Sequence, residues 1–277
     1  LGDDMDLSMF SAYGELILYP SSTIEETIER TRDADVVFSN KIPMNEQTLG
    51  KANNLKYIGI TATGTNNVDF EFTNRRGIVV TNVAGYSTDS VAQHTFAMTF
   101  YLLEKLRHFD DFVKSGGYSR SHLFCDYNEK FWQLSGKTWG IIGLGAIGRK
   151  AAQIAAVFGC RVIYYSTTGN NNHPDYTRVD LDTLLRESDV VSVHAPLTPA
   201  TEGMMNYEAF SKMKKTAIFI NVGRGPIVVE SDLVRALQEN LIAAAGLDVM
   251  SIEPLPADSP LLTIQDSRKL LLTPHIG

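Results

Sequence analysis

The sequence predicts an α/β protein built from two doubly wound domains, each a mostly parallel sheet with helices on both faces. Three observations support this fold class. Short β-rich apolar runs alternate with stretches of helical spacing, a stretch over residues 89–114 contains neither Gly nor Pro, and the alternation then resumes at Lys137. We therefore place the boundary near residue 90 and expect domains of residues 1–90 and 91–277.

Composition restricts the class of protein further. Of the 277 residues, 44% are hydrophobic, which suits a buried core rather than disorder. The formal net charge of -7 argues against nucleic acid as the main partner, because phosphate binding needs clustered Lys and Arg. Cys125 and Cys160 fit neither a metal-binding nor a disulfide spacing, so we expect no metal and a cytoplasmic location. No apolar run reaches the length of a membrane span and no signal peptide opens the chain, so we expect no membrane partner.

The first half alternates strands and helices. We expect strands at residues 16–19, 36–38, 55–60 and 78–81, and helices at residues 23–32, from Pro43, and at residues 70–76. Ser22 and Glu25 form a capping-box pattern that would start the first helix. The opening residues resemble the entry to a helix, whereas such a domain usually begins with a strand. Because Gly277 also follows directly on a candidate catalytic motif, we expect the chain to be trimmed at both ends.

The second half begins with residues 89–114, which we interpret as one long helix ending at Gly116 and Gly117. Residues 118–134 show no clear periodicity. Six further strands are expected at residues 138–142, 161–165, 190–194, 217–221, 243–248 and 270–272.

A Gly-x-Gly-x-x-Gly motif follows the first of these strands and precedes a helix expected at residues 149–158. Gly143 makes the tight turn, Gly145 lets the backbone approach a pyrophosphate, and Gly148 lets helix and strand pack closely. The helix N-terminus, with Ala146 and Ile147, offers N–H groups to the phosphates. The motif in this context predicts a dinucleotide cofactor.

The residue that would choose between NAD and NADP is not acidic. An Asp or Glu is expected after the second strand, where it would hold the adenosine ribose, but Ser166 occupies that position and Thr167 follows. Hydroxyls do not repel a 2′-phosphate, so NADP is permitted, yet no Arg follows immediately to pair with that phosphate. Asp175 and Asp180 come too late to serve, and both cofactors remain open.

Three later segments each follow an expected strand and carry Arg224, Glu253 and His275. Because ligands bind at the carboxyl ends of parallel strands, these side chains could converge on one site. Arg224 could hold a carboxylate and polarise an adjacent carbonyl. His275 could exchange a proton with a carbonyl or hydroxyl oxygen, while Glu253 would fix its tautomer and favour its charged form. The remaining histidines outside these motifs are interpreted as structural or exposed: His94, His108, His122 and His173.

The chain resembles the D-isomer-specific 2-hydroxyacid dehydrogenase family over nearly its whole length. The resemblance rests on residues 134–143, 221–226, 246–256 and 273–277. Residues 62–69 and 86–94 are similar to the glycerate dehydrogenase, or hydroxypyruvate reductase, branch. The resemblance implies a flavodoxin-like substrate domain, a Rossmann NAD(P)-binding domain, and an active site in the cleft between them. It also implies a homodimer with the long helix in its interface.

The resemblance assigns residues to each part of the site. Thr63 and Gly64 are expected to bind the substrate with Arg224 and His275, and Thr88 to lie near the cofactor. The complete set expected to bind the cofactor is Gly143, Gly145, Ala146, Ile147, Gly148, Ser166, His194, Ala195, Pro196, Thr201, Val222, Gly223, Asp248 and Thr88. Of these, Asp248 and Val222 are expected near the nicotinamide, and residues 194–196 could line the adenosine pocket.

The leading functional hypothesis is NAD(P)H-dependent reduction of hydroxypyruvate or glyoxylate to D-glycerate or glycolate. One alternative is another D-2-hydroxy acid, such as D-lactate. Formate dehydrogenases resemble this pattern but carry Gln at the position of Glu253, and a phosphorylated substrate would need more basic residues than Lys41. A non-enzymatic, nucleotide-sensing corepressor is a further alternative, disfavoured by the acidic composition and the lack of appended interaction segments.

Overall fold

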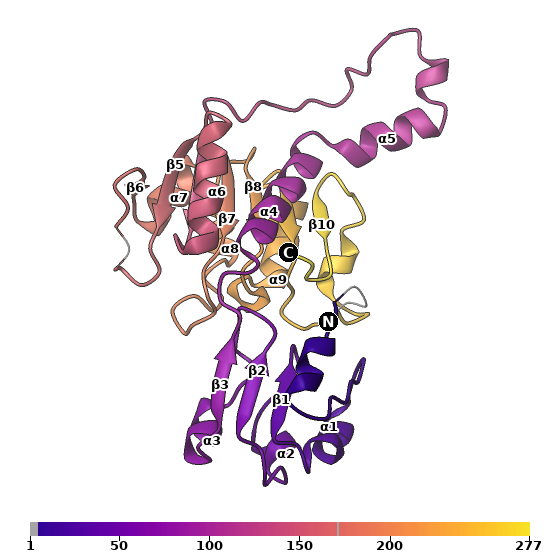
Figure 1. Cartoon of the computed structure of the whole chain (residues 1–277). Helices are drawn as coiled ribbons and strands as arrows, with labels where there is room; N and C mark the ends of the chain where they lie inside the picture. The colour runs from indigo at the N-terminus through magenta and orange to yellow at the C-terminus, as the bar shows by residue number, and fades with distance from the viewer. Residues whose placement is uncertain (1–4, 171) are drawn as a thin grey trace. The chain divides into compact units, whose positions relative to one another are not determined.

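The structure is a computed structural model that describes residues 5–170 and 172–277 (Figure 1). The chain divides into two compact units, residues 5–87 and residues 88–277. The boundary expected near residue 90 falls in the first turn of a helix that begins at Thr88. Among the described residues, no helix is both long enough and apolar enough to cross a bilayer.

Unit 1 is a small parallel α/β unit. Its elements are η1 (Ser8–Ala12), α1 (Ile24–Thr31), β1 (Val36–Ser39), α2 (Glu46–Leu49), β2 (Tyr57–Ile60), α3 (Phe70–Arg75) and β3 (Val79–Asn82). The strands lie in chain order, β1-β2-β3, and both pairs are parallel. Met44, Leu49, Ile58 and Phe72 are almost completely buried between the sheet and its helices. This core fixes the loop after β2, which carries Thr63 and Gly64.

Two expectations for this unit are wrong. Residues 16–19 form no strand: Ile17 and Leu18 are each 61% exposed, and no described strand pairs with them. A strand needs a neighbouring strand to pair with, which a short apolar run cannot supply by itself. The capping box also lies one residue later than expected, because Thr23 accepts from the Glu26 N–H at 3.2 Å and Glu26 accepts from the Thr23 N–H at 2.8 Å. The helical turn expected in the opening residues is the 3₁₀ helix η1.

Unit 2 is a doubly wound sheet of parallel strands. The strands are β4 (Thr138–Ile142), β5 (Arg161–Tyr165), β6 (Thr177–Arg178), β7 (Val190–Val193), β8 (Ile218–Asn221), β9 (Ala244–Leu247) and β10 (Leu270–Leu272). Their order is β10-β9-β8-β7-β4-β5-β6, and every pair is parallel. The order reverses at β4, whose neighbours are β5 and β7. This reversal is the switch point at which open α/β sheets bind ligands.

Helices cover both faces of this sheet. They are α4 (Thr88–Leu103), α5 (Leu106–Lys114), α6 (Ala146–Val157), α7 (Leu181–Glu187), α8 (Tyr207–Lys212) and α9 (Glu230–Gln238), with short 3₁₀ turns η2 (Tyr118–Arg120), η3 (Gly225–Ile227) and η4 (Pro260–Thr263). The core on one face combines α4 and α6, and the core on the other combines α7, α8 and α9. Every residue of β4, β7, β8 and β9 is buried, as expected for strands packed on both faces.

The single helix expected over residues 89–114 is wrong, because two helices meet at Lys105. The backbone of Lys105 is left-handed, with φ of 53°, and its ammonium pairs with Glu129, which also binds Arg268. Helix α4 is buried against the sheet, whereas α5 buries none of its residues. Tertiary contacts at the junction therefore override the uninterrupted helical propensity. Figure 1 shows α5 and the segment after it extending from the body of unit 2 as an arm.

Candidate active site

The glycine-rich turn after β4 packs directly against the segment after β7. Gly143 has a φ of +92°, and a Cβ on it would lie 2.8 Å from the backbone N and Cα of Ala195. Neither the dihedral angle nor the space admits another residue. A Cβ on Gly223, after β8, would similarly lie 2.9 Å from the Ala195 oxygen. The turns after β4, β7 and β8 therefore form one continuous surface at the switch point.

The other two glycines of the motif have different surroundings. A Cβ on Gly148 would lie 2.2 Å from the Gly143 oxygen, so this glycine permits the close approach of α6 to the turn. A Cβ on Gly145 would meet no atom within 4 Å. Gly145 is also the N-cap of α6 and provides no side-chain cap for its first N–H groups. The open side of the turn, lined by uncapped helical N–H groups, fits a pyrophosphate.

His194 ends β7 beside this turn and belongs to a buried hydrogen-bond chain. The Trp139 indole N–H donates to Ser192 Oγ at 2.9 Å, and Ser192 Oγ lies 3.0 Å from His194 Nε2. The serine hydroxyl can therefore donate to Nε2, which leaves the ring proton on Nδ1. Burial lowers the pKa of His194 to about 4, so the ring is neutral at pH 7. His194 Nδ1 is buried without a partner among the described residues, consistent with a polar group of the dinucleotide binding beside it.

The loop that carries Arg224 is clamped by the buried side chain of Asn221 at the end of β8. Its Oδ1 accepts from the Gly223 N–H at 3.0 Å, and its Nδ2 donates to the Arg224 oxygen at 3.0 Å. The next residue, Gly225, is in closer contact still: a Cβ on it would lie 1.9 Å from the backbone carbonyl of Met250. The loops after β8 and β9 therefore pack backbone to backbone, which brings the arginine loop against the glutamate loop.

Glu253 and His275 form a direct pair. His275 Nδ1 lies 2.7 Å from Glu253 Oε2, while Glu253 Oε1 accepts from the Met250 N–H at 3.0 Å. The hydrogen bond from the backbone of its own loop therefore orients the Glu253 carboxylate toward the His275 ring. Because Nδ1 faces a carboxylate, it carries a proton, and Nε2 is the nitrogen available for proton exchange. Both side chains are about one-third exposed, as a site for a small substrate requires.

The histidine loop is held in place by the buried carboxylate of Asp248. Asp248 Oδ1 accepts from Thr273 Oγ1 at 2.6 Å and from the Ile276 N–H at 3.0 Å, and Oδ2 accepts from the Gly277 N–H at 3.0 Å. The Asp248 backbone oxygen accepts from the His275 N–H at 2.8 Å. His275 has a left-handed backbone, with φ of 57°, which costs about 1–2 kcal/mol in a non-glycine residue. These hydrogen bonds offset that strain.

Several supporting residues were not predicted as part of the site. Asn221 lies in a segment that the sequence singled out, and an Asn at a strand end is a recognisable turn signal, here two residues before Gly223. His94, interpreted from sequence as structural or exposed, lies with Nε2 3.0 Å from Thr273 Oγ1 and 3.3 Å from Asp248 Oδ1. It comes from α4 and is 179 residues from Thr273 along the chain, so no local pattern could indicate this contact.

The remaining predicted residues lie in different places. Thr201 is buried and holds its own turn, since its Oγ1 donates to the Pro196 oxygen at 2.7 Å. Thr88 begins α4 in unit 2. Thr63 and Gly64 lie in unit 1, where Thr63 Oγ1 donates to the Val83 oxygen at 3.3 Å. Their contacts with cofactor and substrate stay predictions.

Known proteins match this architecture and these motifs. The family model for the NAD binding domain of the D-isomer specific 2-hydroxyacid dehydrogenases matches residues 96–277. The chain is 39% identical to the hydroxypyruvate reductase of Blautia hydrogenotrophica, over 99% of this chain and 86% of the relative. It is 37% identical to the glycerate dehydrogenase of Methylorubrum extorquens, over 92% of this chain and 79% of the relative.

Solved structures agree with the sequence relatives. A D-lactate dehydrogenase from Aquifex aeolicus, solved with NAD and lactic acid, matches with a TM-score of 0.87 and 29% identity, over 99% of this chain and 86% of that one. An acyclic imino acid reductase, solved with NADPH and D-Arg, matches with a TM-score of 0.87 and 28% identity, over 97% and 84% of the two chains.

These relatives share the parallel α/β architecture, and the family model covers the unit that carries the glycine-rich turn and the Arg224, Glu253 and His275 loops. The chain therefore belongs to the D-isomer specific 2-hydroxyacid dehydrogenases, in the glycerate dehydrogenase and hydroxypyruvate reductase branch, and is an NAD(P)-linked oxidoreductase that interconverts small 2-keto and 2-hydroxy acids.

Proposed function

We propose that this enzyme reduces hydroxypyruvate or glyoxylate to D-glycerate or glycolate, with His275 as the acid/base residue. The observation that carries the assignment of roles is the 2.7 Å pair between His275 Nδ1 and Glu253 Oε2, located where strands β8, β9 and β10 end side by side. The substrate class is supported by the relatives named hydroxypyruvate reductase, glycerate dehydrogenase and glyoxylate reductase.

The proposed roles follow from the donors and acceptors of the site. When bound, the nicotinamide supplies or accepts the hydride at the substrate carbon. The His275 imidazolium donates its Nε2 proton to the carbonyl oxygen in reduction and recovers it from the hydroxyl in oxidation. Glu253 orients the ring through its 2.7 Å contact with Nδ1. Arg224, whose Nη1 donates to the Gly223 oxygen at 2.7 Å, presents a guanidinium fork that suits a substrate carboxylate.

The test is the loss of NADH or NADPH absorbance on addition of hydroxypyruvate, glyoxylate, pyruvate or 3-phosphohydroxypyruvate. We expect the first two to give the highest kcat/KM. A preference for pyruvate would instead support a D-lactate dehydrogenase, as in the Aquifex aeolicus neighbour. No turnover with any of the four would refute the proposed substrate class.

The role of His275 is tested by His275→Ala. Loss of a general acid/base lowers turnover by about 10²–10⁴-fold. Cofactor binding, measured by the fluorescence of bound NADPH or NADH, should change little because the glycine-rich turn is separate from this side chain. An unchanged kcat in the variant would contradict the assignment.

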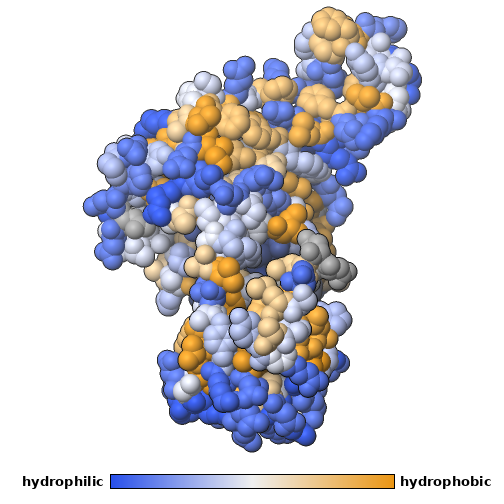
Figure 2. Space-filling model, in the orientation of Figure 1, coloured by the Kyte–Doolittle hydropathy of each residue, from blue (hydrophilic) through white to orange (hydrophobic). Residues whose placement is uncertain are grey.

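We also propose that the enzyme is a homodimer that uses the arm formed by α5 and residues 115–131. This arm exposes large apolar side chains, among them Leu106 at 47%, Phe124 at 85% and Phe131 at 56%. Figure 2 shows apolar atoms on its surface. Exposed patches of this kind mark interaction surfaces, and a second copy would cover them. Sedimentation velocity should give a dimer, and Phe124→Asp should weaken it.

The protein is proposed to act in the cytoplasm. Cys125 and Cys160 are both free thiols, and burial raises the pKa of Cys160 to about 11, which keeps it unreactive. Fractionation of cells that produce the protein, with activity as the marker, checks the location.

A further inference from the structure

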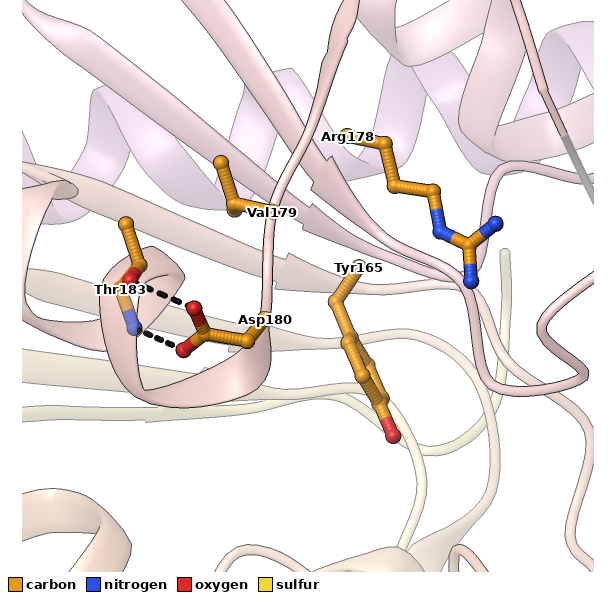
Figure 3. Close-up of a pocket in the computed structure, with 5 residues that line it drawn as sticks. All are labelled: Tyr165, Arg178, Val179, Asp180 and Thr183. Atoms are coloured by element: carbon orange, nitrogen blue, oxygen red, sulfur yellow. Dashed lines mark hydrogen bonds between the residues drawn. The ribbon is translucent and has the colours of Figure 1, made fainter.

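An open pocket of about 600 Å³ lies at the carboxyl ends of β5 and β6. Its lining combines the ends of both strands with the start of α7 and consists of Tyr165, Arg178, Val179, Asp180 and Thr183 (Figure 3). The volume is typical of a small-molecule site. In a doubly wound sheet, the end of the strand that follows the glycine-rich helix holds the adenosine ribose of a dinucleotide. The strand in that position is β5, so the pocket lies where the ribose hydroxyls would be recognised.

The turn that leaves β5 occupies the position at which a doubly wound fold recognises the ribose. It begins at Ser166, whose oxygen accepts from the Gly169 N–H at 3.3 Å. Arg178 comes from the neighbouring strand and reaches this same turn: its Nη1 donates to the Gly169 oxygen at 2.8 Å and to Asn172 Oδ1 at 3.3 Å. The sequence indicated no arginine close after Ser166. Arg178 lies 12 residues after Ser166 in the sequence, and its pairing with Tyr164 across β5 and β6 brings it beside this turn.

The charges at this pocket favour an anion beside Arg178. Within residues 5–170 and 172–277, Arg178 forms no ion pair with a carboxylate. The acidic member of the pocket, Asp180, has both oxygens engaged, since Oδ1 accepts from the Thr183 N–H and Oδ2 from Thr183 Oγ1, each at 2.8 Å. In the view of Figure 3, the Asp180–Thr183 pair and Arg178 lie on opposite sides of Tyr165. The Asp180 carboxylate therefore caps α7, and the Arg178 guanidinium is the cationic group beside the turn after β5.

We propose that Arg178 receives the 2′-phosphate of NADP(H), so that this enzyme binds NADPH in preference to NADH. The inference rests on the proposed function only in that unit 2 takes a dinucleotide at the glycine-rich turn. Two features combine to give the preference. Ser166 replaces the carboxylate that would hold the 2′-hydroxyl and repel the phosphate, and Arg178 supplies a fork of donors that binds phosphate. Because the guanidinium is exposed, solvent and salt screen the pairing, and we expect about a tenfold preference rather than the hundredfold of a buried site.

The test separates the ribose phosphate from the rest of the cofactor. Isothermal titration of the protein with adenosine 2′,5′-bisphosphate and with 5′-AMP should give a Kd about tenfold lower for the bisphosphate. The difference should shrink as KCl is raised, because the contact is electrostatic. Equal affinities for the two nucleotides, or binding of neither, would overturn the inference.

Two arginine variants test whether Arg178 is the residue responsible for the preference for the 2′-phosphate. Arg178→Gln should remove most of the difference between the two nucleotides while leaving the Kd for 5′-AMP within about twofold. Arg186→Gln is the matched control, because Arg186 is an exposed arginine on the neighbouring helix α7 that pairs with Asp182, and it should keep the full difference. If Arg178→Gln weakens both nucleotides equally, the residue only supports the turn and the inference is wrong.

A complementary variant, Ser166→Asp, should shift the preference toward NADH by restoring the acid. These outcomes are independent of the substrate assay. Turnover of keto acids with NADH in preference to NADPH would reject this inference and leave the proposed function intact. Selective binding of adenosine 2′,5′-bisphosphate without turnover of any keto acid would support this inference and reject the proposed function.

Discussion

Replacement of Asp248 by Asn tests whether one buried carboxylate holds the histidine loop. The Asp248 side chain is only 2% exposed and accepts hydrogen bonds from Thr273 Oγ1 and from the N–H groups of Ile276 and Gly277. Asn has nearly the same shape, and its single oxygen can keep the bonds to Thr273 and Ile276. Its amide nitrogen, however, would face the Gly277 N–H, so that two donors meet where a donor met an acceptor.

The magnitude follows from these three hydrogen bonds. A bond to a charged group contributes about 1.5–3 kcal/mol and one between neutral groups about 0.5–1.5 kcal/mol, so the variant loses one strong bond and weakens two others. The neutral amide recovers part of this because it has less desolvation cost than a buried carboxylate. We expect the attachment of the loop to weaken by about 2–3 kcal/mol. At 1.4 kcal/mol per factor of ten, that is about a 30- to 150-fold larger open population.

Amide hydrogen exchange measures the opening directly. The Ile276 and Gly277 amides, both bound to Asp248, should exchange about 30- to 150-fold faster in Asp248→Asn, and the keto-acid reductase kcat should fall with them. Asp258→Asn is the control: Asp258 is exposed in the same C-terminal segment and should leave both quantities unchanged. Exchange rates in Asp248→Asn within about threefold of the native protein would refute the anchoring role.

Three further predictions address the packing, the pH dependence and the catalytic pair. Gly225→Ala should lower the free energy of unfolding in urea by about 3 kcal/mol or more, because the new Cβ would lie 1.9 Å from the backbone of Met250. Gly14→Ala is the control: a Cβ there would meet no atom within 4 Å, so the free energy of unfolding should change by no more than about 0.5 kcal/mol. His194 has a folded-state pKa of about 4, below its ordinary value of 6.5, so the unfolded chain binds more protons between these values. Stability should therefore fall by up to about 3 kcal/mol as the pH drops from 6.5 to 4, and His194→Gln should flatten this dependence. Glu253→Gln should lower kcat about tenfold or more by removing the charge beside the histidine, while Glu208→Gln on the exposed face of α8 should have no effect; equal rates in both would contradict the pairing.

The second unit was predicted well because its signals are local. Six expected strands appear as β4, β5, β7, β8, β9 and β10, and the glycine-rich turn lies where the motif places it. Buried parallel strands appear in sequence as short apolar runs, and the Gly143 and Gly148 contacts explain why those positions exclude side chains. The two-residue strand β6 was not predicted, since Thr177 and Arg178 carry no apolar signal and pair only because β5 has an open edge.

The errors arise where distant contacts decide local structure. Residues 16–19 form a short, continuous apolar run typical of a strand but lack a described partner strand. Residues 89–114 have helical propensity throughout, yet the ion pairs of Lys105 with Glu129 and of Glu129 with Arg268 accompany a left-handed backbone that divides the helix. Neither the missing ladder partner nor the distant ion pairs can be recognised from a window of neighbouring residues.

The sequence by itself determined the family of this protein, the dinucleotide-binding turn and the three residues proposed for proton transfer and carboxylate binding. Each of these depends on residue types at fixed spacing after a strand, and parallel strands end at one edge of a sheet. Only the tertiary structure decided what holds those residues and which side chains lie beside the turn after β5. Asp248 and His94 meet on the histidine loop from 154 residues apart along the chain, and Arg178 reaches the Ser166 turn through the pairing of β5 with β6. Contacts between separate elements depend on the packing of the whole sheet and its helices, which no local pattern records.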